Sequence, residues 1–323
     1  MSAGTTYQTA GEGRPRRGDP NRRSPRIDPR EVAQAHRLVE AISRTFDSKV
    51  VGQEALRTAL LVGLIGGGHV LLESVPGLAK TLAASTLAST VDASFSRVQC
   101  TPDLLPSDII GTQVFNPGSS TFTTELGPVH ANVVLLDEIN RSSAKTQAAM
   151  LEAMQEKQAT IGAKTYPMPD PFLVLATQNP IDEEGTYVLP QAQMDRFLLK
   201  VIVDYPSPAD EVEMLRRLKS GVLASRTVPP VVSRQDVLWL QALSRRVYVD
   251  EALLRYIVQI VHATRHGGDY LPQEQAHCLE YGASPRATIA FVEAACAHAL
   301  IHGRDHVIPD DVRAMRYMVL RHR

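Results

Sequence analysis

The 323-residue sequence is poor in cysteine, in long apolar runs and in net charge. Its three cysteines are odd in number and far apart, which excludes a disulfide framework and fits a reducing compartment, so we expect a cytoplasmic protein. No apolar run approaches the roughly 18 residues of a membrane span, and the N-terminus has no apolar signal segment, so we expect no membrane insertion. A formal net charge of -1 argues against a protein that works through bulk attraction to nucleic acid or lipid.

The sequence does contain enough apolar material for a sizeable core, with 44% hydrophobic residues in a length typical of about two domains. Residues 1–30 are rich in Gly, Pro, Ser and Arg and cannot bury enough apolar area to fold, so we expect a disordered basic tail. No aromatic residues separate the arginines, which favours a solvated tail over an arm that binds nucleic acid or lipid. We expect an α/β domain over residues 31–204 and a helical domain over residues 205–323.

Residues 70–81 have the pattern of a strand, a phosphate-binding loop and a helix. Backbone N–H groups at the start of such a helix point at phosphates, and the helix dipole favours their negative charge. Lys80 would reach the β- and γ-phosphates, and the hydroxyl of Thr81 would ligate Mg²⁺. Ser74 and Ala79 stand at the two glycine positions of the motif, so an ordinary strand-to-helix turn is the alternative interpretation at this point.

Two carboxylates follow the next strongly apolar stretch, residues 131–136. Such a stretch is typical of a strand buried in a parallel sheet, and ligands bind at the carboxyl ends of these strands. Asp137 can hold the water shell of Mg²⁺, and Glu138 can polarise an attacking water. A polar strand end that only begins the helix predicted at 142–158 is the alternative, but the position downstream of a phosphate loop favours the catalytic interpretation.

Three further polar residues stand at the ends of predicted elements. Asn179 follows the apolar strand 172–177 and could contact a γ-phosphate, although an asparagine before proline is also common in turns. Arg196 precedes a strand and either pairs with Asp195 or projects outward; from the residues alone we favour the pair. Arg286 lies in the first turn of a predicted helix, where the dipole disfavours positive charge, which predicts an anionic partner elsewhere.

The remaining elements are two hairpins and a helical region. The stretches 111–127 and 160–170 are β-prone around turn-forming residues and predict hairpins. Beyond residue 207 the pattern is helical only, with helices predicted at 211–218, 234–244, 251–264, 285–301 and 310–320. Asp250 and Asp310 are the expected N-caps, and Gly303 is the expected C-cap.

Taken together, six ordered strings resemble the AAA+ ATPases, and specifically the MoxR family, over about residues 31–320. They are Gly77-Leu78-Ala79-Lys80-Thr81, Thr101-Pro102-Asp103-Leu104-Leu105-Pro106-Ser107-Asp108, Asp137-Glu138-Ile139-Asn140-Arg141, Leu151-Glu152-Ala153-Met154-Gln155-Glu156, Ala176-Thr177-Gln178-Asn179-Pro180 and Asp195-Arg196-Phe197. The resemblance implies an α/β fold: a P-loop AAA+ parallel five-stranded sheet flanked by helices, followed by an all-α lid domain.

The resemblance also implies a role for each matching position. ATP would be held by Val51, Gly52, Pro76, Gly77, Leu78, Ala79, Lys80, Thr81 and Leu82, with Val51 and Gly52 against the adenine. Thr81 and Asp137 would ligate Mg²⁺, and Glu138 would be the catalytic base. Asn179 matches sensor 1, Arg286 matches sensor 2, and Arg196 resembles the arginine finger that reaches the nucleotide of the next subunit. The two hairpins resemble the helix-2 insert and the hairpin before sensor 1.

The function implied is Mg²⁺-dependent ATP hydrolysis by a chaperone-like remodeller or activator of partner proteins. Family members form ring hexamers and often work with a protein that carries a von Willebrand factor A domain. The alternatives are a nucleic-acid translocase, a chelatase-type motor for metal insertion, and a non-catalytic nucleotide-binding scaffold. The stretch 111–127 contains no Lys or Arg, which argues against a track for nucleic acid.

Overall fold

A computed structural model describes residues 27–75, 77–179, 187–223, 228–276, 279 and 281–323. Its centre is a five-stranded sheet with the strand order β2-β5-β8-β1-β9, in which every neighbouring pair is parallel. The strands are β1 (Val70–Glu73), β2 (Phe95–Gln99), β5 (Val133–Asp137), β8 (Leu173–Gln178) and β9 (Leu199–Ile202). The predicted fold class is therefore confirmed.

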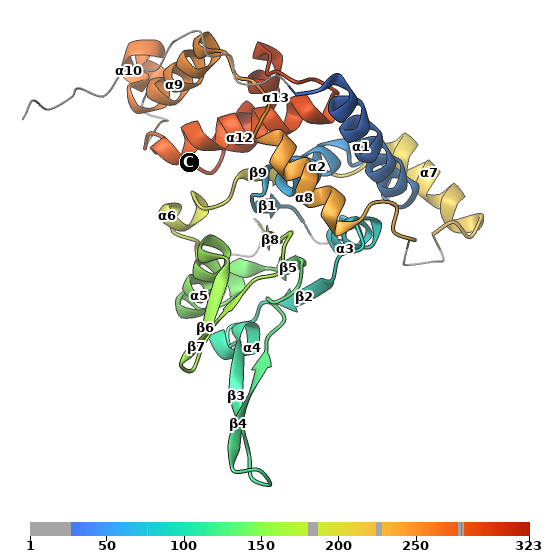
Figure 1. Ribbon diagram of the computed structural model, residues 1–323. Coiled ribbons are helices and arrows are strands. Elements are labelled where there is room, and N and C mark those ends of the chain that lie inside the picture. Colours follow the sequence, from blue (N-terminus) through green and yellow to red (C-terminus); the bar gives the residue numbers. More distant parts are fainter. Residues whose placement is uncertain (1–26, 76, 180–186, 224–227, 277–278, 280) are drawn as a thin grey trace, which may run out of the picture.

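The three central strands are buried on both faces, which is why they read as unbroken apolar runs. Alternate residues point to opposite faces: Val70 and Leu72 belong to one core cluster, whereas Leu71 belongs to the other. The first cluster includes apolar residues of α1 (Pro29–Lys49), α2 (Glu54–Gly66) and α3 (Lys80–Thr90). The second includes those of α4 (Pro106–Ile110) and α5 (Ala144–Glu156), so helices cover both faces (Figure 1).

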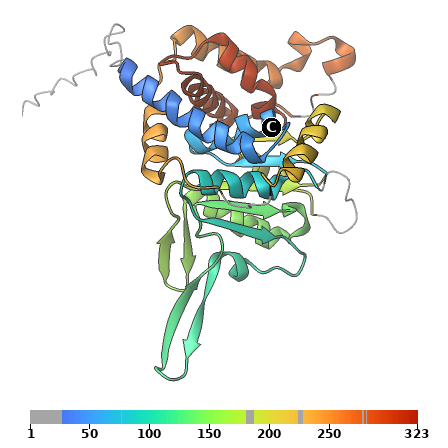
Figure 2. The same ribbon diagram turned by 90° about the vertical axis from the view of Figure 1, so that its right-hand side faces the viewer.

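Two antiparallel hairpins extend from this core, as the sequence predicts. The larger pairs β3 (Gly111–Asn116) with β4 (Thr121–Leu126) and reaches far beyond the rest of the chain in both views (Figure 1, Figure 2). The smaller pairs β6 (Gln158–Ile161) with β7 (Lys164–Pro167). The hydroxyl of Tyr166 donates a hydrogen bond of 2.9 Å to Thr124 Oγ1, so the smaller hairpin braces the base of the larger one.

The C-terminal part of the chain is helical, with one isolated bridge between Tyr248 and His306. Its longer helices are α7 (Pro208–Lys219), α8 (Arg234–Ser244), α9 (Glu251–Arg265), α12 (Pro285–Ile301) and α13 (Pro309–Leu320). This part also has two short helices, α10 (Gly267–Tyr270) and α11 (Gln273–Ala276). Two other short helices, η1 (Ile139–Arg141) and α6 (Gln191–Met194), lie between strands of the sheet along the chain. Among the described residues, no helix combines the length and apolarity that a bilayer crossing requires.

The predicted helix ends are partly right. Asp250 caps α9, where its side chain accepts the N–H of Ala252. Asp310 does not cap α13, because the helix begins one residue earlier: Ile308 is the N-cap, and its N–H donates to the carboxylate of Asp311 at 2.8 Å. Gly303 follows the end of α12 with φ 69°, a left-handed conformation that favours glycine.

The apolar core runs without a break from the sheet into the helical part. Residues of α8, α9, α12 and α13 belong to the same cluster as the strands and α2. Of the predicted tail, residues 1–26 lie outside the described part of the chain, whereas α1 begins at Pro29, inside the expected tail. The division at residues 204 and 205 stays a prediction.

A buried ion network joins α12 to α13. The carboxylate of Asp311 is fully buried and accepts bonds from Arg304 at 2.5 and 2.6 Å, while His298 Nδ1 lies 2.6 Å from Asp311 Oδ1. Burial alone would raise the pKa of Asp311, but the hydrogen bonds from Arg304, His298 and the backbone of Ile308 hold this pKa well below its usual range.

We therefore expect Asp311→Ala to lower the free energy of unfolding by about 3 kcal/mol, because it leaves buried donors without an acceptor. Since the pKa of Asp311 is depressed in the folded state, this carboxylate stabilises the protein fully above the usual aspartate pKa of about 3.9, and its contribution is lost as the pH falls toward the depressed value. Urea unfolding at pH 7 and pH 3.5 measures both effects. Asp310→Ala is the matched control; an equal loss in both variants would contradict the prediction.

Candidate active site

The loop between β1 and α3 has the conformation that a phosphate cradle requires. Gly77 has φ 89°, and a Cβ built on it would meet no atom within 4 Å, so its backbone faces open space. Ala79 also has a positive φ, 55°, although it carries a side chain. Helix α3 begins at Lys80, so Lys80 and Thr81 lie in its first turn, where backbone N–H groups lack partners within the helix. Pro76 lies outside the described residues.

Ser74 occupies the first glycine position of the motif without strain. Its side chain is buried, its φ is not positive, and its N–H donates to the carbonyl of Gln178 at 3.1 Å. This bond fastens the beginning of the loop to the end of the neighbouring strand β8. The conformational freedom of glycine is therefore not needed at this position.

Two carboxylates end strand β5 and meet a threonine from strand β8. The hydroxyl of Thr177 donates to Asp137 Oδ1 at 2.7 Å and accepts the N–H of Glu138 at 2.8 Å. Glu138 has φ 58°, a left-handed conformation that is uncommon for a side-chain-bearing residue and that recurs at functional sites. Thr177 thus positions both acidic residues, a role that the sequence analysis did not predict.

Each of these carboxylates also has an arginine partner. Asp137 Oδ2 accepts from Arg97 Nη2 at 2.6 Å and from Arg97 Nε at 3.2 Å. Glu138 Oε2 lies 3.2 Å from Arg141 Nε. Burial lowers the pKa of the Lys80 ammonium, and the negative charges of Asp137 and Glu138 oppose this shift. Lys80 and the two carboxylates therefore belong to one electrostatic site.

The oxygen atoms of this site suit a hard cation that also binds the oxygens of a phosphate ligand. Asp137 offers a carboxylate and Thr81 a hydroxyl, the oxygen ligands that Mg²⁺ takes in proteins together with phosphate oxygens. Within the described part of the chain, no cluster of three or more His, Cys, Asp or Glu residues could hold a metal by itself. Asn179 follows β8, which lies between β5 and β1, so its half-buried side chain belongs to the same edge of the sheet.

A cavity of about 430 Å³ adjoins the loop on the side of α7. Its lining includes five residues predicted to bind nucleotide, namely Val51, Gly77, Leu78, Ala79 and Leu82. Tyr205, Met214 and Leu215 close it from the opposite side, and their apolar groups make it suitable for a flat ring. Sequence reasoning missed these three: Met214 and Leu215 because the helical period of α7 does not reveal which face meets the loop, and Tyr205 because it precedes that helix.

Gly52 does not line this cavity but permits the close approach of α7. It has φ 69°, and a Cβ at this position would lie 2.6 Å from Asp210 Cγ. Asp210 belongs to the capping box that begins α7 with Ser207. A side chain at residue 52 would therefore push α7 away from the cavity.

Arg196 and Arg286 are brought together, but not at this site. Both line a cavity of about 310 Å³ at the opposite edge of the sheet, where β1 and β9 begin. The predicted ion pair between Arg196 and Asp195 is wrong: Asp195 accepts instead from Arg323 Nε at 2.8 Å and from Ser284 Oγ at 2.7 Å. Arg196 Nε is buried and, among the described residues, has no hydrogen-bond partner.

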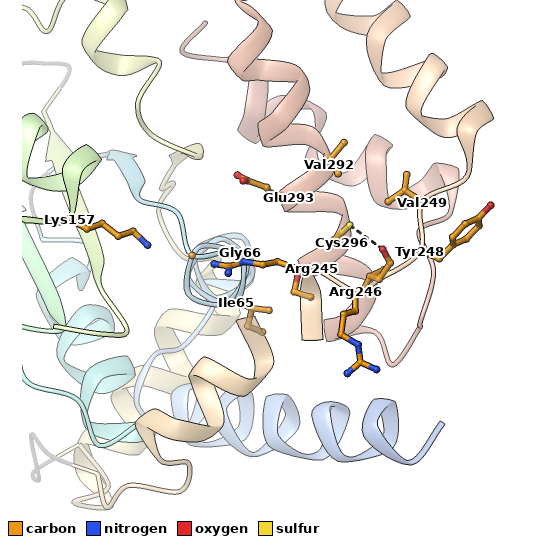
Figure 3. Close-up of a pocket in the computed structure, with 13 residues that line it drawn as sticks. Ile65, Gly66, Lys157, Arg245, Arg246, Tyr248, Val249, Val292, Glu293 and Cys296 are labelled. Atoms are coloured by element: carbon orange, nitrogen blue, oxygen red, sulfur yellow. Dashed lines mark hydrogen bonds between the residues drawn. The ribbon is translucent and has the colours of Figure 1, made fainter. Parts of the chain in front are cut away.

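A cavity of about 750 Å³ adjoins this second site (Figure 3). Lys157 borders it from the end of α5, whereas Glu293 and Cys296 border it from α12. Burial raises the pKa of Glu293, and the charges of Arg245, Lys157 and Arg323 oppose this shift. No part of the loop or of the acidic pair lines this cavity, so we do not assign it to the reaction.

Comparison with known proteins is consistent with this geometry. The sequence profile of the ATPase family associated with various cellular activities (AAA) matches residues 69–199, and that of the AAA lid domain matches residues 271–323. The chain is 50% identical over 294 residues to Chaperone MoxR1 of Mycobacterium tuberculosis, covering 90% of this chain and 76% of that protein. It is 31% identical over 307 residues to Protein MoxR of Paracoccus denitrificans, covering 90% of each.

The crystal structure of a candidate ATPase from Cytophaga hutchinsonii has the same fold. It superposes with a TM-score of 0.83 at 44% identity, and the match covers 91% of this chain and 89% of that one.

Cys100 offers a test of the packing behind the acidic pair. This residue is fully buried beside Asp137, whose carbonyl accepts its N–H at 2.9 Å, and burial raises the pKa of its thiol to about 12. At pH 8 only about one thiol in 10⁴ would be ionised. We expect Cys100 to resist iodoacetamide in the native protein and to react after unfolding in urea, as read by peptide mass spectrometry. Labelling within minutes in native buffer would contradict this packing.

Proposed function

The chain belongs to the MoxR family of AAA+ ATPases, and on this basis we propose that it hydrolyses ATP with Mg²⁺ to remodel or activate partner proteins. The observation that carries the proposal is the meeting of Lys80, Asp137 and Glu138 at one edge of the sheet, beside a cavity that suits a nucleotide base. A phosphate-binding loop without acidic partners would fit a scaffold better than an enzyme.

Each residue has a definite task in the proposed reaction. Lys80 and the first N–H groups of α3 bind the β- and γ-phosphates. Thr81 and Asp137 would hold Mg²⁺, which neutralises charge on these phosphates when bound. Glu138 orients a water molecule in line with the γ-phosphate and polarises its O–H bond. Asn179, beside this water, would detect the γ-phosphate, and Thr177 keeps both carboxylates in position.

We assign Arg196 and Arg286 to the nucleotide of a neighbouring protomer. The two arginines lie where β1 begins, whereas the phosphate-binding loop follows the end of β1. The four residues of this strand span about 13 Å at 3.3 Å per residue, so neither arginine reaches a γ-phosphate bound in its own protomer. A buried guanidinium N–H without a partner is costly, which supports the arrival of an anion at Arg196. Protomers joined head to tail in this way form a closed ring when the rotation between them closes, and the family suggests a ring of six members.

The protruding hairpin β3–β4 is the proposed contact with a protein client. Phe115 and Phe122 face each other across it with ring centroids 5.2 Å apart, and both are at least half exposed. Apolar rings that remain in water at the end of a hairpin suit contact with protein. The only charged residue in the hairpin is Glu125, which does not suit phosphate binding. A protein with a von Willebrand factor A domain is the partner that the family suggests.

The test of the proposed function is complementation between two inactive variants. Arg196→Ala should fold normally and lose about 10³- to 10⁵-fold in ATPase rate, and Lys80→Ala should lose nucleotide binding. An equal mixture should recover about one quarter of the parent rate, because one interface in four then joins an intact loop to an intact arginine. Phosphate release is the measurement.

A chain that carries both substitutions, mixed with Arg196→Ala, is the control and should stay inactive. An Arg196→Ala protein that hydrolyses ATP like the parent would remove this residue from the mechanism. Absence of recovery in the mixture would show that the arginine acts within its own protomer.

For the hairpin, we expect the double variant Phe115→Ala/Phe122→Ala to keep the basal ATPase rate within about twofold and the same melting temperature, because both rings are exposed. Its capture of clients should be lost. This is measured by a pull-down with a Glu138→Gln background in ATP, which should bind nucleotide without turnover. Thr121→Ala/Thr123→Ala on the same hairpin is the matched control. Equal recovery of clients by both double variants would exclude the aromatic pair.

A further inference from the structure

Arg97, on the edge strand β2, forms an ion pair with Asp137, the carboxylate that the proposed function assigns to the metal. Its guanidinium donates twice to Asp137 Oδ2, at 2.6 and 3.2 Å, while the hydroxyl of Thr177 occupies Asp137 Oδ1. Both oxygens of this carboxylate are therefore engaged. The Asp137 side chain is only 12% exposed, whereas that of Arg97 is 47% exposed, so the arginine can leave and the aspartate cannot.

A nearly buried carboxylate needs a positive partner. Without one, its desolvation is not compensated, and the charge destabilises the surrounding structure. A guanidinium and a divalent cation repel each other, so the two compete for one carboxylate oxygen. A cation that binds Asp137 Oδ2 therefore competes with both hydrogen bonds of Arg97.

We propose that Arg97 is a positioning residue that substitutes for the divalent cation at Asp137 and is displaced when the metal–nucleotide complex binds. This inference rests on the proposed function. Gln99 provides a place for the displaced guanidinium: it lies on the same face of β2, and its Oε1 accepts from Arg97 Nη2 at 2.8 Å. Arg97 then lowers the affinity of the site for metal but keeps Asp137 aligned until the metal arrives.

The test measures metal affinity, not turnover. Mn²⁺ is titrated into the full-length protein saturated with ADP, and bound Mn²⁺ is read by electron paramagnetic resonance. We expect Arg97→Gln to bind Mn²⁺ about three- to tenfold more tightly than the parent, because the competing ion pair is gone. Arg97→Lys keeps the charge but loses the two-pronged contact, so its affinity should lie between the two.

Arg246→Gln is the matched control. Arg246 is 46% exposed and binds Glu31 through two bonds, at 2.9 and 3.0 Å, far from Asp137 along the chain. Its removal should leave Mn²⁺ affinity unchanged. Equal gains in both variants would indicate a general effect of net charge and would overturn the proposal.

Thermal melting gives an independent measurement. In EDTA without nucleotide, Arg97→Gln should melt below the parent, since Asp137 loses its partner; with Mg²⁺ and ADP, the difference should shrink or vanish. Unchanged or weaker Mn²⁺ binding by Arg97→Gln, while the parent binds normally, would overturn the role of Arg97 alone. A parent protein that binds no Mn²⁺ in the presence of ADP would overturn the proposed function together with this inference.

Discussion

One carboxylate that is only 13% exposed, that of Asp195, joins three distant parts of the chain. It accepts from Arg323, whose side chain is 2% exposed, and from Ser284, the N-cap of α12. It also immediately precedes Arg196, while Arg286 lies two residues after Ser284. The arrangement of both arginines at one edge of the sheet therefore depends on this carboxylate, and the ion pair fixes the helical part against the entry to β9. Removing one partner of such a pair is costly because it leaves a buried charge without compensation.

Much of the fold could be predicted from the sequence, because the governing signals are local. The apolar runs 131–136 and 172–177 are strands buried on both faces, and the turn residues between β-prone stretches mark real hairpins. The strand–loop–helix order predicts the loop and Lys80, and the apolar run 131–136 predicts where the acidic pair lies, since parallel strands bring their carboxyl ends to one edge. From the sequence, Ser74 is only a departure from the glycine expected at the first position of the phosphate-loop motif. In the structure, its N–H donates to the carbonyl of Gln178 in an ordinary backbone conformation, which explains why serine fits there.

The rest depends on contacts between residues far apart in sequence, which no local pattern encodes. Asp195 has Arg196 as its neighbour yet binds Arg323, 128 residues away. Arg97 and Thr177 each lie 40 residues from Asp137 and reach it only because β2 and β8 flank β5. The start of α13 also differs from expectation, because proline suits the first helical position and moves the cap to Ile308.

The unbroken core between the sheet and α12 has a mechanical consequence. Gly66, the last residue of α2, packs against both: a Cβ built on it would lie at ordinary van der Waals distance from α12, 3.9 Å from the Cβ of Ala297, and would be crowded by Leu198 Cδ2, at 3.2 Å, next to β9. Interiors packed in this way resist compression and transmit strain. Each protomer should then turn as a stiff lever, so that a small rotation at the phosphate loop becomes a long sweep at the far tip of β3–β4.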